Sequence, residues 1–144
     1  MVSPQAPSRG LAARSVMYEF PRARRIRRRS EFVRIQNAPS ARVPTRHLLM
    51  LLRPRESPGP ARLGVVASRK VGGSVVRNRT KRLVREAFRK NPDAFPDNLD
   101  VVVILRPGAH LLPAGELEAQ VRQAKSALHR RAAELAAAGL HVSR

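Results

Sequence analysis

The hydrophobic residues of the chain gather in three short runs, each followed by glycine or proline. The runs occupy residues 47–52, 62–68 and 100–106, and each has the length of one strand. Within them, apolar residues follow one another instead of alternating with polar ones, which is typical of buried strands such as the central strand of a sheet. We therefore expect three strands of one sheet, with a further short strand near 41–43.

Two segments outside these runs carry the spacing of amphipathic helices. The first is short: Ser30 is expected as its N-cap, and Phe32 and Ile35 face inward. The second covers residues 75–90, and Ser74 is expected to cap it. The first helix precedes the strands, and the second connects two of them.

A third helix is expected over residues 114–138, ending at Gly139. The order helix, two strands, helix, strand, helix predicts an α/β (α+β) two-layer sandwich. We expect a central, mostly antiparallel sheet of about four strands covered by helices. The 144 residues fit one domain over 20–139, with a disordered extension at 1–19 and a tail at 140–144.

The charge of the chain favours a binding protein. Lys and Arg number 29 against 10 Asp and Glu, which gives a net charge of +19. A compact chain with this charge repels itself, so the charge indicates a polyanionic partner. Cysteine is absent, which excludes disulfides, zinc–thiolate sites and a thiol nucleophile. No apolar run approaches the roughly 18 residues that span a bilayer, so we expect a cytoplasmic protein with no membrane partner.

The cations are most concentrated on the helix expected at 75–90. Its inward arc holds Val76, Thr80, Leu83, Val84, Ala87 and Phe88. Its outward arc holds Arg77, Asn78, Arg79, Lys81, Arg82, Arg85 and Arg89, with Glu86 as the only acid. Like charges one turn apart cost about 0.2–0.5 kcal/mol per pair, so phosphates are the expected compensating partner.

The usual DNA-binding modules do not fit this sequence. Helix-turn-helix spacing, zinc ligands and a heptad zipper are all missing from it. The paired aromatics of an RNA-recognition motif are missing as well. The residues alone therefore predict an α/β RNA-binding domain that uses a basic helix.

A nuclease acting through its own side chains is a second class of function. Such enzymes need clustered carboxylates to hold metal ions, and the nearest candidates are Asp93, Asp97 and Asp100. Prolines and a turn lie among them, so a structural role at helix ends and turns fits better. The histidines are scattered, at His47, His110, His129 and His141. We therefore expect no catalytic and no metal-binding residue in this chain.

Residues 62–88 closely resemble the signature of the protein subunit of bacterial ribonuclease P; they read RLGVVASRKVGGSVVRNRTKRLVREAF. That signature joins a strand ending in Ser-(Lys/Arg)-Lys to a Val/Ile-Gly turn and a helix bearing Arg-Asn-Arg-x-Lys-Arg. The matching residues here are Ser68-Arg69-Lys70, Val71-Gly72 and Arg77-Asn78-Arg79-Thr80-Lys81-Arg82, followed by Arg85. The resemblance covers about residues 20–130.

This resemblance implies a fold and an activity. The family's fold includes a left-handed βαβ crossover and is shared with the second domain of a small-subunit ribosomal protein. The family's holoenzyme removes the 5′ leader of precursor tRNA by phosphodiester hydrolysis, and its RNA subunit with bound Mg²⁺ carries the catalysis. The implied partners are the ribonuclease P RNA and precursor tRNA, and no protein partner is implied.

The resemblance also implies two sets of binding residues. Those expected to face the catalytic RNA are Arg77, Asn78, Arg79, Lys81, Arg82 and Arg85. Those expected in a central cleft for the single-stranded leader are Phe32, Ser68, Arg69 and Lys70. Two aromatics of the family are replaced here, one by Gln36 and the other by Leu51 or a neighbour. The leader is then held either more weakly or more by arginine.

Two alternatives stay open at this point. A ribosomal-protein-like RNA-binding protein without enzymatic context would share the charge, but not the register of residues 62–88. Phe32 is either a stacking surface for the leader or a plain core residue.

Overall fold

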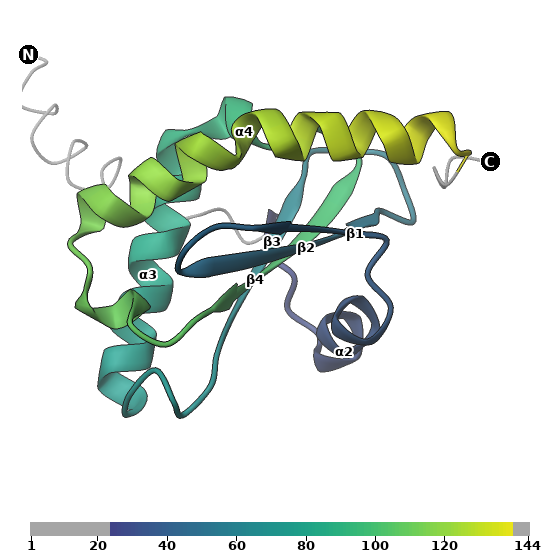
Figure 1. Ribbon diagram of the computed structural model, residues 1–144. Coiled ribbons are helices and arrows are strands. Elements are labelled where there is room, and N and C mark those ends of the chain that lie inside the picture. The colour runs from purple at the N-terminus through teal and green to yellow at the C-terminus, as the bar shows by residue number, and fades with distance from the viewer. Residues whose placement is uncertain (1–23, 140–144) are drawn as a thin grey trace, which may run out of the picture.

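The computed structural model describes residues 24–139, which fold around one sheet (Figure 1). The expected extension at 1–19 and tail at 140–144 lie outside the described residues. The elements are α2 (Arg29–Asn37), β1 (Ala41–Pro44), β2 (Leu48–Pro54), β3 (Arg62–Ala67), α3 (Ser74–Lys90), β4 (Leu99–Leu105) and α4 (Ala114–Ala137). Two short 3-10 helices, η2 (Pro92–Ala94) and η3 (Ala109–Leu111), flank β4.

The four strands form one mixed sheet in the order β1-β2-β4-β3. β1 pairs with β2 and β2 with β4 in antiparallel fashion, whereas β3 and β4 are parallel. Parallel neighbours need a crossover connection, and α3 supplies it between β3 and β4. The expected order of elements, the mostly antiparallel sheet and the additional short strand are confirmed.

Helices cover both faces of the sheet, but unequally (Figure 1). Side chains alternate between the faces along each strand, so Met50 and Leu52 lie on one face and Leu51 on the other. Among the described residues, the core under α3 and α4 holds 23 buried residues. The core under α2 holds four, and they are Ile26, Ile35, Leu51 and Val102. The continuous apolar runs of the sequence reflect this two-sided burial.

Most of the inward arc of α3 is buried as expected, although Val76 is only half-buried, and this arc decides which side of the helix faces outward. Thr80, Val84, Ala87 and Phe88 are buried, and Leu83 packs against the same core. The Thr80 hydroxyl donates a hydrogen bond to the Val76 carbonyl at 2.9 Å. The polar member of the arc is thereby satisfied within its own helix.

The two serine caps expected from the sequence are wrong. α2 begins at Arg29, so Ser30 lies within its first turn, and α3 begins at Ser74 itself after Gly73. Neither helix has a side-chain cap hydrogen bond. In α2 the preceding chain is held by a bridge between Arg25 and Leu63, which places the start of the helix.

The C-terminal end of α4 lies close to the position expected from the sequence. The helix stops at Ala137, and Gly139 takes a positive φ of 75°, which favours glycine after a helix. No helix between residues 24 and 139 combines the length and the apolar character that crossing a membrane requires.

Candidate nucleic-acid interface

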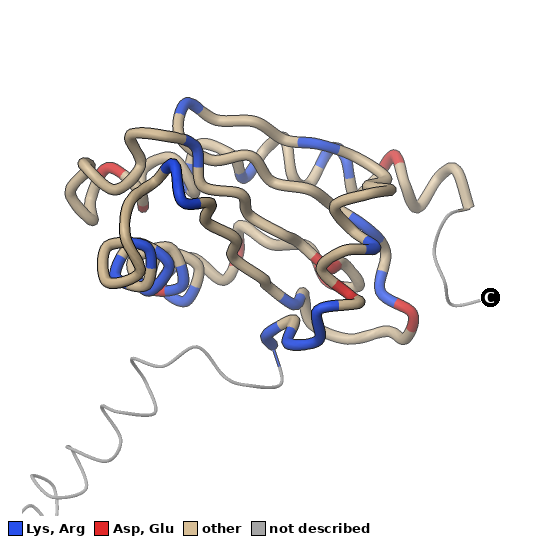
Figure 2. Tube along the Cα trace, turned by 90° about the horizontal axis from the view of Figure 1, so that it is seen from below, with Lys and Arg blue, Asp and Glu red and all other residues tan. Residues whose placement is uncertain are grey.

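The outward side of α3 carries two rows of polar residues, and all of them except Asn78 are basic. Arg77, Lys81 and Arg85 follow one another at four-residue steps and are half-buried. The more exposed row consists of Asn78, Arg79 and Arg82. Figure 2 shows Lys and Arg gathered along α3 and along the segment that enters α2. The two segments are far apart in the sequence, yet the charge of Arg25, which precedes α2, acts on Arg85 of α3.

Burial and neighbouring positive charges disfavour the charged forms of two residues in the half-buried row. Burial lowers the pKa of Lys81, and the neighbouring charges of Arg85 and Arg77 lower it further. Burial also lowers the pKa of Arg85, with Arg25 and Arg82 adding to the effect. A polyanion bound here would favour the charged form of each group and so relieve the repulsion.

Acidic residues on α3 compensate little of this charge. Glu86 is the only carboxylate of the helix, and it binds Arg89 through two hydrogen bonds of 2.9 and 3.1 Å. The Nε of Arg77 is buried and finds no hydrogen-bond partner among residues 24–139. The single carboxylate of α3 thus leaves most of the positive charge on the outward side of the helix without an acidic neighbour on the same helix.

A groove runs between α2 and β3 and reaches α3. Its volume is about 360 Å³. It is lined by Arg27, Arg29, Phe32, Val33, Gln36, Val65, Val66, Ala67 and Lys81. We call this site the α2–β3 groove. It combines three cations, one aromatic ring and an apolar floor, with no carboxylate.

Phe32 lies on the floor of the α2–β3 groove. Its ring rests directly over Gly64 of β3, where any β-carbon would overlap the ring. The side chain is half-buried against the small core and lines the groove. It therefore contributes to the core and to the groove surface at once.

The turn after β3 carries the other residues expected at the leader. Ser68, Arg69 and Lys70 are exposed and directly follow Ala67, which lines the α2–β3 groove. The turn is closed by the Val71 amide, which donates to the Ser68 carbonyl at 3.0 Å. This hydrogen bond holds the three residues beside the groove.

The structure groups the expected residues differently in one respect. Lys81, expected to face the catalytic RNA, lines the α2–β3 groove together with Phe32. Arg27 and Arg29 also line it and were not expected, although the arginine-rich run at 22–34 was their signal in the sequence. The replaced aromatics have separate fates, because Gln36 lines the groove and Leu51 is only 3% exposed beneath α2.

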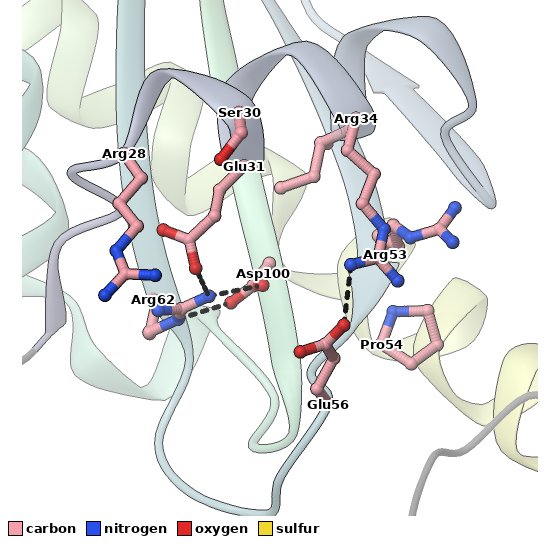
Figure 3. A pocket seen from close by; sticks show the side chains of 10 residues that line it. Arg28, Ser30, Glu31, Arg34, Arg53, Pro54, Glu56, Arg62 and Asp100 are labelled. Carbon is pink, nitrogen blue, oxygen red and sulfur yellow. Dashed lines mark hydrogen bonds and ion pairs between the residues drawn. The ribbon is translucent and has the colours of Figure 1, made fainter.

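A second pocket lies on the other side of α2, and each of its three carboxylates binds an arginine (Figure 3). Its volume is about 220 Å³. Arg62 donates two hydrogen bonds of 2.8 Å to Asp100 and one of 3.2 Å to Glu31. These carboxylates raise the pKa of Arg62, with the Asp100 hydrogen bond as the first cause. Arg34 binds Glu56 at 2.6 Å at the same pocket. Three carboxylates make this pocket a poor site for phosphates.

The carboxylates suggested for a nuclease do not converge. Asp100 is 7% exposed and held by Arg62, and the carbonyl of Asp93 binds the His129 ring at 2.8 Å. Within residues 24–139, no three His, Asp or Glu side chains lie together as metal ligands would. His141 lies outside the described residues. This donor set does not fit a protein-bound catalytic metal ion.

Comparisons with known proteins agree on one family. The family model described as Ribonuclease P matches residues 20–129. The ribonuclease P protein component of Desulfovibrio desulfuricans is 44% identical over 93 residues, which are 64% of this chain and 71% of the relative. That of Geotalea uraniireducens is 37% identical over 113 residues, 78% of this chain and 97% of the relative.

Solved structures of similar proteins have the same fold. The RNase P protein of Staphylococcus aureus aligns with a TM-score of 0.62 and 26% identity, covering 69% of this chain and 90% of that protein. The RNase P protein of Thermotoga maritima aligns with a TM-score of 0.61 and 29% identity, covering 69% and 92%.

Proposed function

Because the chain belongs to the ribonuclease P protein family, and so has a role in tRNA processing, we propose that it binds the catalytic RNA and the 5′ leader of precursor tRNA together. In doing so it assists the endonucleolytic removal of the leader, which leaves the mature 5′ end. A precursor tRNA substrate favours the cytoplasm as the site of action.

One observation carries this proposal: an uncompensated basic helix lies beside a groove with an aromatic floor. The exposed row of α3, with Arg79 and Arg82, is accessible to a large folded RNA. Phosphate contacts by such residues release counterions and supply most of the affinity for nucleic acid. We assign this row to the catalytic RNA.

The α2–β3 groove supports the second half of the proposal. A single strand exposes its bases, and each base that stacks on an aromatic ring gains about 1–3 kcal/mol. Phe32 offers such a ring, and Arg27, Arg29 and Lys81 supply cations for the backbone. We assign the groove to the leader, with Ser68, Arg69 and Lys70 continuing its path.

Arg77 and Arg85 lie in the same half-buried row as Lys81. This row separates the groove from the exposed row, so it can neutralise phosphates of either RNA. Two polyanions held side by side repel each other, and cations between them offset that repulsion. We propose that the half-buried row has this bridging role.

The catalytic chemistry is assigned to the RNA subunit. The carboxylates described above are engaged elsewhere or stand apart, so we propose that Mg²⁺ is held by the RNA and not by this chain. The protein's contribution is then to bind substrate and to lower the Mg²⁺ concentration at which the RNA works.

Reconstitution tests the proposal. The purified chain is added to a protein-free bacterial ribonuclease P RNA at low Mg²⁺ with a 5′-labelled precursor tRNA. We expect cleavage at the mature 5′ end, and none when the RNA is omitted. Cleavage without RNA would show a protein nuclease. Tight RNA binding without stimulation would instead support an RNA-binding protein with no enzymatic context.

A further inference from the structure

We propose that Glu31 and Arg62 are positioning residues: their ion pair sets how α2 stands over the sheet, and so the width of the α2–β3 groove. That the RNA bound in the groove is the 5′ leader rests on the proposed function. The geometry of α2 does not, and it can be measured on the protein alone.

Apolar contacts alone hold α2 weakly. The helix has nine residues, and Ile35 is the only one of them that is buried. The small core beneath it holds three further buried residues, Ile26, Leu51 and Val102, and the apolar residues packed against them are only partly buried, namely Phe32, Leu49, Val66 and Ile104. α2 also lacks a side-chain cap. With so little apolar area buried, polar contacts have a large share in fixing its position.

Arg62 is a rigid anchor for such a contact. It is the register partner of Asp100 on the neighbouring parallel strand, and two hydrogen bonds of 2.8 Å join the two side chains. Asp100 is itself 7% exposed. The guanidinium is planar, so this two-point contact fixes its plane and aims a remaining N–H at Glu31, 3.2 Å away (Figure 3).

The two contacts of α2 with β3 lie close together on both elements. Glu31 and Phe32 are consecutive on the helix, and their partners Arg62 and Gly64 are two residues apart on the strand. The ion pair acts on one side of α2 and the ring lies on the other, beside the groove. Without the ion pair, the helix can pivot about the Phe32–Gly64 contact.

The other ion pair of α2, between Arg34 and Glu56, is not expected to fix the position of the helix. Arg34 and Glu56 are 51% and 75% exposed, and Glu56 lies on the turn between β2 and β3. Solvent and salt weaken such a pair, and its turn gives no rigid support. Glu56→Gln is therefore a matched control, since it removes one carboxylate partner of α2 while leaving every hydrogen bond of Arg62 in place.

The test compares Glu31→Gln, Glu31→Asp and Glu56→Gln. Glu31 lies in the first helical turn, where any negative charge stabilises the helix. Glu31→Asp keeps that charge but shortens the side chain, so that the carboxylate no longer reaches Arg62. This variant therefore distinguishes loss of the ion pair from loss of helix stability. The chain has no cysteine, so spin labels can be attached only at introduced sites. Asn37→Cys on α2 and Gln123→Cys on α4 are exposed positions on opposite faces of the sheet.

We expect Glu31→Gln and Glu31→Asp to broaden and shift the distance distribution between the labels, while Glu56→Gln keeps that of the parent. With the reconstituted RNA, both Glu31 variants should raise KM for precursor tRNA about fivefold and leave kcat within about twofold.

Parent-like distances and KM in both Glu31 variants would overturn the proposal, and so would a parent-like Glu31→Asp beside an altered Glu31→Gln. If Glu31→Gln does not fold, Glu31→Asp alone decides. If the parent chain fails to stimulate the RNA, the proposed function fails, and the distances still decide the positioning role.

Discussion

The two faces of the sheet differ in what their covering helices do. Under α3 and α4, 23 of the described residues are buried in one core, and under α2 only four are. The first face therefore holds most of the stability. The second is covered just enough to fix α2, which leaves the α2–β3 groove open beside it. The difference teaches that this fold buries most of its core on one side of the sheet and leaves a groove on the other.

The two sides of α2 differ in a related way. The α2–β3 groove has three cations and no carboxylate, whereas the pocket on the other side has three carboxylates that pair with two of its four arginines. Both pockets are rich in arginine, so arginine content alone does not identify the binding side. The absence of acids among the lining residues distinguishes the α2–β3 groove, and this is why we propose it as the binding side.

The largest expected effect is on stability, and it should differ between the faces. Leu128 lies fully buried in the larger core, and Leu128→Ala should lower the free energy of unfolding by about 2–5 kcal/mol. Ile35→Ala empties part of the small core, where α2 can shift to fill the space, so its loss should be smaller. Urea denaturation followed by circular dichroism measures both, and equal losses would contradict the comparison.

Gly64→Ala should act on both properties of the second face. The added methyl group overlaps the Phe32 ring and should cost about 1–3 kcal/mol of stability. It should also weaken binding of precursor tRNA and spare mature tRNA, because it displaces the groove floor. In a Phe32→Ala background the same substitution should have a smaller effect on both, because only the 3.3 Å approach to the β-carbon of Ile26 remains. An undiminished effect there would show that the two residues act independently.

Charge removal on the exposed row of α3 should affect affinity without affecting the fold. Arg79→Ala and Arg82→Ala should each lower the salt slope of catalytic RNA binding by about one unit, the value for one lost phosphate contact. Arg122→Ala is the control, since Arg122 lies on α4 and pairs with Glu118. Binding titrations at several salt concentrations measure the slopes. An unchanged slope in both α3 variants would show that Arg79 and Arg82 do not contact phosphates of the catalytic RNA.

The smallest effect is expected at the exposed pair on the acidic side of α2. The hydrogen bond from Arg34, followed by its charge, holds the pKa of Glu56 below its ordinary value of 4.5. A lowered pKa adds stability above the ordinary value, and this stability is lost as the pH falls through the folded value. The melting temperature of Glu56→Gln should thus lie slightly below that of the parent at neutral pH and converge with it in acid. A gap that widens in acid would contradict this account.

The strands and the arcs of α3 could be predicted from the sequence because burial repeats along each element with its own period. The inward arc with Thr80, Val84 and Phe88 is an example. The first residues of α2 and α3 could not be predicted in this way. A bridge to Leu63 precedes α2 and a turn precedes Gly73 at α3, and neither helix is capped by its serine side chain.

The groove was also only partly predictable. Phe32 and Lys81 meet there although 48 positions separate them in the sequence, and Lys81 was expected to face the other RNA. The role of Gly64 depends on a ring from another element lying over it, which no local pattern reveals. The resemblance to the family supplied the roles of residues, and the structure supplied which of them share a surface.

The central claim is that the α2–β3 groove takes the leader and the exposed row of α3 takes the catalytic RNA. Because the chain has no cysteine, photoreactive groups can be attached at Gln36→Cys in the groove and at Asn78→Cys on α3. In the reconstituted complex, the groove probe should cross-link to the leader of precursor tRNA. With mature tRNA, which has no leader, this cross-link should be absent. The α3 probe should cross-link to the catalytic RNA with either tRNA. Cross-links from both probes to the same RNA segment would contradict the claim.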